Sequence, residues 1–196
     1  MLRPQPPDNL YESFAVANEV GSWVTDTFLR EGSALHNPEH EHLLDATIGF
    51  LWTDIENTRA GKMVLGQAMI PNFKGDKWST GRQVFQLRDW FGVEPDFVIT
   101  LHTSLVEFDD MAFCAVVEHE LYHCAQLTDA DGNLRWTKQR DPIWTIRGHD
   151  YEGFVGTVRR YGITQADQKM IDFVEAAKHA PLISSVDVRA SCGTCR

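Results

Sequence analysis

The sequence lacks any apolar run approaching the roughly eighteen residues that a membrane-spanning helix needs, so no helix is expected to cross a membrane. Its first residues, MLRPQPPDNL, lack the apolar stretch of a signal peptide. Only 4 cysteines occur in 196 residues, too few for a dense disulfide framework. Cys114 and Cys124 would lie about 15 Å apart along one helix, too far to bridge. A reducing cytoplasm is therefore the expected location.

Basic residues are also scarce, with 18 Lys and Arg against 28 Asp and Glu and a net charge of −10. This balance argues against nucleic acid as a strong direct partner, because such affinity comes largely from cations on phosphates.

Apolar residues are abundant and make up 43% of the chain. This content, together with the length of the chain, predicts a globular core. We expect a disordered lead-in over 1–8, a single domain over 9–181, and a tail over 182–196. The oligomeric state is not determined by the sequence.

Periodicity and turn signals predict an α+β fold, with a small mixed or antiparallel sheet packed on a central helix and flanking helices. Helices are expected at 9–30, at a short segment starting with Pro38, and at 111–127, 150–161 and 165–180. Strands are expected at 46–52, 62–70 and 96–102, with a loop at 71–80, a hairpin turn near 128–133 and possible strand character at 183–188. Residues 83–91 fit either a strand or a short helix.

The predicted helix at 111–127 carries the motif HExxH in His119, Glu120 and His123. Residues four apart lie on one face of a helix, so both histidines can present a ring nitrogen to one metal ion. Glu120 points about 100° away round the helix, where it can hold a water on the metal and take its proton. A helix that is otherwise apolar on two sides belongs in a domain interior. This division of labour is typical of zinc hydrolases.

Catalytic zinc takes three protein ligands and leaves the fourth position to water. A metzincin would supply the third as a histidine six residues after His123, but that position is Asp129. The third ligand must then follow later in the chain. We prefer His149 at the start of the predicted helix, with Glu152 and Asp150 as alternative ligands or as groups that orient a ligand.

Two further groups of potential ligands are given other roles. His36 and His40, in a segment that also contains His42, have the i, i+4 spacing but a Pro between them and no Glu in the place that Glu120 takes in HExxH, and we interpret them as surface or substrate-side residues. Cys192 and Cys195 form one CxxC pair, which is half of the four-ligand set that a zinc ribbon needs. The pair is expected to lie free in a frayed terminus.

The runs HELYHC and RGHDYEGFVGTVRRYG, with the strands KMVLGQA and DFVITLH before them, resemble the phage metallopeptidase family over roughly 40–162. That family is similar in layout to SprT-like and other small gluzincin-type proteases. The resemblance implies a zincin-like fold, zinc held by His119, His123 and His149, and Glu120 as general base. It implies a protein or peptide substrate, and the host cytoplasm if a phage encodes the chain.

The function that these residues predict is zinc-dependent hydrolysis of peptide bonds, with an extended peptide added along the strand that ends at His102. A donor for the developing oxyanion is also needed. The candidates for it are Tyr151, Tyr161, Arg147 and His102. Two alternatives are a non-catalytic, zinc-stabilised binding protein acting on a host factor and a metal-dependent hydrolase of another substrate class.

Overall fold

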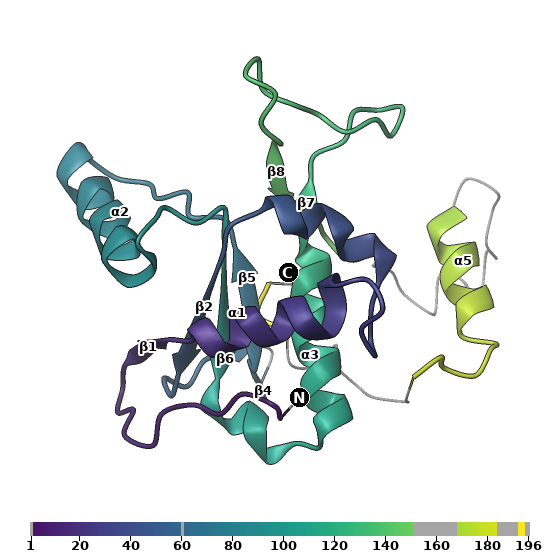
Figure 1. Ribbon diagram of the computed structural model, residues 1–196, viewed down its shortest axis with the longest axis horizontal. Coiled ribbons are helices and arrows are strands. Elements are labelled where there is room, and N and C mark those ends of the chain that lie inside the picture. Colours follow the sequence, from purple (N-terminus) through teal and green to yellow (C-terminus); the bar gives the residue numbers. More distant parts are fainter. Residues whose placement is uncertain (1, 60, 151–167, 184–191, 195–196) are drawn as a thin grey trace.

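The computed structural model describes residues 2–59, 61–150, 168–183 and 192–194. Its centre is a four-stranded sheet in the order β1-β2-β6-β5 (Figure 1). Strands β2 and β6 run parallel, and the two outer pairs are antiparallel. The bounds are Phe14–Val16 for β1, Ile48–Thr53 for β2, Gly66–Met69 for β5 and Phe97–His102 for β6. This mixed sheet with its helices confirms the predicted α+β class.

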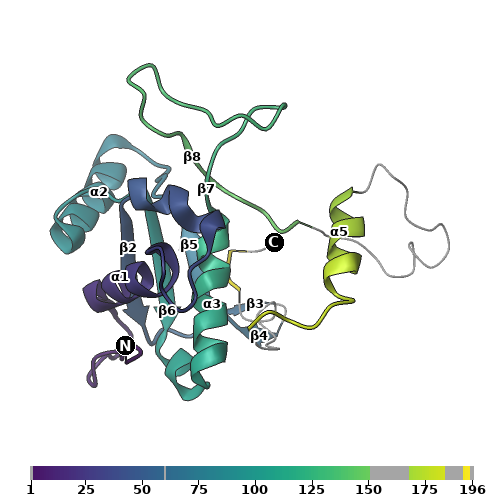
Figure 2. The same cartoon turned by 45° about the vertical axis from the view of Figure 1, so that its right-hand side comes forward.

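Side chains alternate across β2 and β6 and so divide the core between the two faces of the sheet. Helices α1 (Asn18–Val24) and α3 (Asp110–His123) pack on one face, and α2 (Lys77–Phe91) packs on the other. Figure 2 shows α3 running beside β5. The buried residues on the face shared by α1 and α3 include Trp23, Phe28, Phe50, Trp52, Ile99, Leu101, Phe113, Val117 and Leu121. The face of α2 buries Leu51, Leu87 and Val98.

Helix α3 begins where the sequence predicts, because the Asp109 carboxylate accepts a hydrogen bond from Ala112 N at 2.8 Å and caps the helix. It ends at His123, four residues before the predicted end. The residues that follow, Cys124–Gln126, form β7 instead and pair antiparallel with β8, Trp144–Ile146. Tertiary strand pairing therefore overrides the helical pattern at this end.

The helix predicted over 9–30 is wrong at its start, where β1 forms the edge of the sheet. The Asp54 carboxylate accepts hydrogen bonds from the backbone of Glu12 and Ser13, both at 3.0 Å, and so fixes the extended chain before β1. Helical backbone starts only at Asn18 and continues as a π-helical turn, η1, over Thr25–Leu29.

The ambiguous segment 83–91 is helical and belongs to α2. The helix begins at Lys77, inside the predicted loop, because the Asp76 side chain accepts from the backbone of Trp78 and Ser79. It ends at Phe91 and is capped by Gly92, whose φ of 74° favours glycine. The predicted strand at 62–70 is divided into β4, Lys62–Met63, which pairs with β3, Thr58–Arg59, and the sheet strand β5.

Other predicted elements have mixed outcomes. The hairpin turn is confirmed, with Asp129 N donating to Asn133 O at 2.9 Å and Gly132 at a φ of 85°. Pro38 starts the 3₁₀ helix η2, Pro38–Asp45. The remaining described helices are η3, Thr103–Glu107, and α5, Gln168–Ala176, the latter within the predicted 165–180. The helix predicted over 150–161 and most of the tail segment 183–188 lie outside the described residues.

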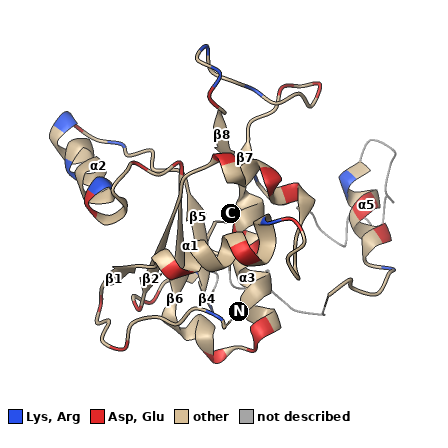
Figure 3. Ribbon diagram, in the orientation of Figure 1, with Lys and Arg blue, Asp and Glu red and all other residues tan. Residues whose placement is uncertain are grey.

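Charges are spread over the molecule, with basic residues on α2, on the loops beyond β7 and β8, and on α5 (Figure 3). Within the described ranges, no helix combines the length and apolarity needed to cross a bilayer.

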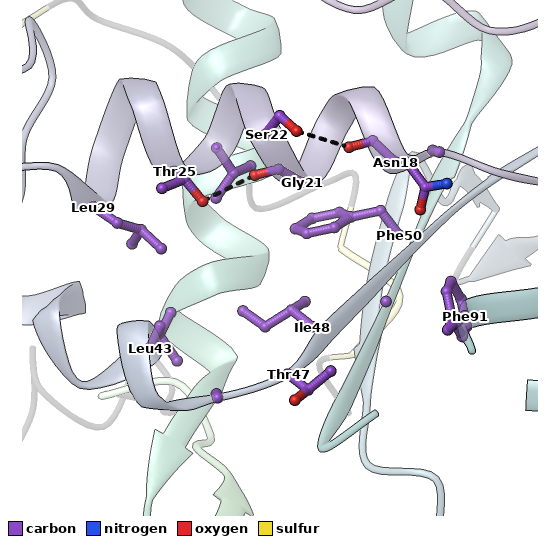
Figure 4. A pocket seen from close by; sticks show the side chains of 14 residues that line it. Asn18, Gly21, Ser22, Thr25, Leu29, Leu43, Thr47, Ile48, Phe50 and Phe91 are labelled. Atoms are coloured by element: carbon purple, nitrogen blue, oxygen red, sulfur yellow. Dashed lines mark hydrogen bonds between the residues drawn. The ribbon is translucent and has the colours of Figure 1, made fainter. Parts of the chain in front are cut away.

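The end of η2, the start of β2 and helix α1 enclose a pocket of about 530 Å³ (Figure 4). Its lining is apolar or neutral and includes Gly21, Thr25, Phe50 and Phe91 but no acidic, basic or histidine side chain. Acid–base or metal chemistry therefore has to be sought elsewhere in the molecule.

Gly49 provides a test of how α2 packs on the sheet. A Cβ at Gly49 would lie 2.7–2.9 Å from three ring atoms of Phe91, so Gly49→Ala must displace that ring. We expect the free energy of unfolding to fall by about 1–3 kcal/mol in urea denaturation. The matched control is Gly81→Ala, on α2 with open space around it, which should raise stability by about 0.5–1 kcal/mol. Equal effects of the two changes would contradict this packing.

Candidate metal centre

The C-terminal half of α3 places His119 and His123 one turn apart, and their Nε2 atoms lie 3.3 Å from each other. His149, which follows β8, brings its own Nε2 within 3.3 Å of His119 Nε2. The structure therefore gathers the three histidines that the sequence singled out, although His149 lies 30 positions after His119.

The β7–β8 hairpin carries the chain back to α3. Arg147 N donates to His123 O at 2.9 Å, which fixes 147–149 beside the end of the helix. The Arg147 carbonyl oxygen also lies 2.6 Å from His123 Nδ1. Because Nδ1 lies against a carbonyl oxygen, it is the ring nitrogen that carries the proton. The unprotonated Nε2 then directs its lone pair toward the other histidines. This partner is typical of histidines that bind metal.

A fourth potential ligand, Cys192, joins the histidines. Its Sγ lies 3.3 Å from His123 Nε2, and the four ligand atoms all lie within 4.8 Å of one another. These four residues can hold a metal ion. The expectation that Cys192 lies free in a frayed terminus is wrong. Cys192 is buried, and its backbone forms a β-bridge with Gly66 at the edge of the sheet. The lone CxxC pair was the available signal, but only the fold brings its first cysteine to α3.

Glu120 is fully buried next to this cluster. Its Oε2 accepts hydrogen bonds from Ala68 N at 2.9 Å and from the Thr194 hydroxyl at 2.8 Å. Its Oε1 has no hydrogen-bond partner among the described residues. The approach of β5 depends on Gly66, where a Cβ would come within 2.9 Å of Glu120 Cγ. A buried carboxylate with one oxygen left over suits a site that receives a water or a ligand.

Burial also determines the protonation of the cluster. It raises the pKa of Glu120, against the hydrogen bond from Thr194. Burial, with His123 and His149 close by, lowers the pKa of His119 to about 4. His119 is therefore neutral at physiological pH, and neutral imidazole is the form that binds metal.

Comparison with known families supports a metal-dependent protein. Residues 21–178 match the model of a family described as putative phage metallopeptidase. The chain belongs to this family. The family description implies a metal and a protein or peptide substrate. No curated protein and no solved structure matches the chain significantly.

The other predicted site residues of this family member lie in different surroundings. The Arg147 guanidinium pairs with Asp150 at 2.7 Å, and Lys169 lies 3.5 Å from the same carboxylate oxygen. Asp150 is thus neutralised by cations and is not part of the histidine cluster. His102 is buried, and its Nδ1 lies 2.7 Å from Ser104 Oγ. Tyr151, Glu152 and Tyr161 lie outside the described residues.

The three upstream histidines do not join the cluster either. His40, interpreted as a surface or substrate-side residue, is not at the surface, since it is 1% exposed, with its Nε2 3.6 Å from Glu118 and its ring against Tyr122. His42 Nε2 lies 2.9 Å from Cys124 O, just after α3. His40 therefore packs against α3 and His42 against the residue that follows it, whereas His36 lies 3.8 Å from Glu41.

Proposed function

We propose that the protein is a zinc-dependent metallopeptidase in which His119, His123 and His149 bind the metal. The observation that carries the proposal is the convergence of three Nε2 atoms beside a buried Glu120. The choice of zinc rests on spacing and donor type. Tetrahedral zinc with Zn–N bonds of about 2.0–2.1 Å separates its nitrogen ligands by about 3.3–3.4 Å. The two nitrogen pairs here are each 3.3 Å apart.

A bound zinc would act as a Lewis acid that lowers the pKa of water toward neutrality and polarises a peptide carbonyl. The protein itself supplies the proton acceptor. Ala68 N fixes one oxygen of Glu120, so the other oxygen is available to take a proton from the attacking water and return it to the leaving amine. The raised pKa of Glu120 favours this exchange, because a base acts best near the working pH.

The position of the substrate differs from the one the sequence suggested. Strand β6, which ends at His102, is paired on both edges and cannot accept a further strand. Strand β5 is the edge of the sheet nearest α3, and Gly66 brings it against Glu120. We therefore assign an extended peptide substrate to the outer edge of β5. A reducing cytoplasm suits this site, since Cys114 and Cys124 are free thiols.

A second function is favoured by one observation. With Cys192 the cluster offers four protein ligands, which is the number found in structural zinc sites. A non-catalytic binding protein of this kind would lose its fold without zinc, and Glu120→Ala would leave its function unchanged.

The experiment that tests peptidase function uses the full chain with Cys192→Ser, which removes the competing ligand. Zinc-loaded protein is expected to cleave casein or itself, to stop when the metal is chelated, and to recover when zinc is restored. Absence of cleavage by a folded chain holding one zinc would favour the binding protein instead.

A further inference from the structure

We propose that Cys192–Thr194 forms a built-in blocking segment, with the Cys192 thiolate as fourth metal ligand in place of water. This inference rests on the proposed peptidase function and adds its regulation. In Figure 2 the segment is the short yellow trace beside α3. Catalytic zinc sites keep one position open, whereas a thiolate there closes the site to water and substrate.

The segment also contacts the Glu120 carboxylate, on the oxygen that Ala68 N holds. Thr194 Oγ1 lies 2.8 Å from Glu120 Oε2, and Ala68 N donates to the same hydroxyl at 2.7 Å. A further contact of 3.1 Å joins this hydroxyl to Ala68 O. A structural zinc site has no need for such contacts with a neighbouring carboxylate. They suggest a segment that fills the place of a reactant.

The same segment covers the edge of β5 that we assign to the substrate. Gly193 N donates to Gly66 O at 2.7 Å, and the backbone of Cys192 forms a parallel β-bridge with Gly66. Gly193 O in turn accepts from Arg59 Nη1 at 2.8 Å and from Gln67 Nε2 at 3.3 Å. Gly193 fits closely, because a Cβ there would lie 2.5 Å from Val64 Cγ1. An extended peptide and the segment therefore compete for one strand edge.

The metal position, the Glu120 carboxylate and the outer edge of β5 become accessible together only when the blocking segment leaves. If the open form is about 0.1–10% of the population, removing the block should raise apparent affinity and rate by about 10–1,000-fold. Cys192→Ser removes the thiolate and keeps the side-chain shape. Thr194→Val keeps the thiolate and removes the hydroxyl contacts.

The test uses the full chain loaded with Co²⁺, whose absorption reports thiolate coordination, and acetohydroxamate, a small chelating probe for an open metal position. Wild type should show thiolate-to-cobalt charge transfer and bind the probe weakly. Cys192→Ser should lose the charge transfer and bind at least about tenfold more tightly. Thr194→Val should keep the charge transfer and still bind the probe more tightly than wild type. Cys114→Ser, a partly buried thiol on α3, is the control and should match wild type.

The zinc-loaded proteins are then compared on casein, where Cys192→Ser should be at least about tenfold faster than wild type. Wild type without charge transfer, or equal probe affinity in wild type and both variants, would overturn the blocking segment. If the cobalt results are as expected but no protein cleaves peptides, the peptidase proposal fails while the assignment of the fourth ligand stands.

Discussion

Glu120→Gln, in a chain that also carries Cys192→Ser, is expected to lower the rate of peptide hydrolysis by about 10²–10⁴-fold, the usual contribution of general acid–base catalysis. Glutamine keeps the size of the side chain, and its carbonyl can still accept from Ala68 N. It cannot take a proton, so activity should fall while zinc content stays at one per chain. Casein cleavage and elemental analysis of the same preparation measure the two quantities.

The matched control is Glu118→Gln, two positions earlier on α3. Glu118 is partly buried, and its carboxylate accepts a hydrogen bond at 2.8 Å from Nδ2 of Asn37, the residue that caps η2. This variant should keep its cleavage rate even if its stability falls. If Glu120→Gln cleaves as fast as its parent, or if both variants lose activity equally, Glu120 is not the proton acceptor.

Local sequence was sufficient for the part of the site that lies on one helix. His119, Glu120 and His123 are close because helical geometry fixes residues four apart, and the Asp109 cap places the start of that helix. His149 could be proposed because it lies at the start of a predicted helix and because only two histidines, His149 and His179, follow the motif. His149 approaches α3 only through the pairing of β7 with β8, which no short-range sequence pattern predicts.

The sequence could not reveal contacts that depend on the sheet. Cys192 reaches the histidines only because the segment lies along β5, and Gly66 is the residue that lets β5 approach Glu120. The same is true of β1, where the helical pattern of 9–30 was overridden by pairing with β2 and by the Asp54 hydrogen bonds. The division into a lead-in, one domain over 9–181 and a tail stays a prediction.

The second large effect is expected at the third ligand. His149→Ala should lower zinc affinity by more than about 100-fold, because losing a group that only orients a ligand already costs about 10–100-fold. With zinc in excess, a 100-fold weaker site removes about 2.7 kcal/mol of metal-linked stability. Competition with a chelator gives the affinity, and thermal unfolding with and without zinc gives the stability. His179→Ala is the control, since His179 is exposed after α5.

The remaining comparison is with Glu152→Ala, which replaces the alternative ligand. We expect this variant to keep its zinc, because three imidazoles already converge without it. Its unfolding temperature should respond to zinc as that of the wild type does, whereas the response of His149→Ala should be much smaller. Loss of zinc from Glu152→Ala, with retention in His149→Ala, would transfer the third position to the carboxylate. The set would then be His₂Glu, in which His149 contributes no bond to the metal and only the two helix histidines remain as nitrogen ligands.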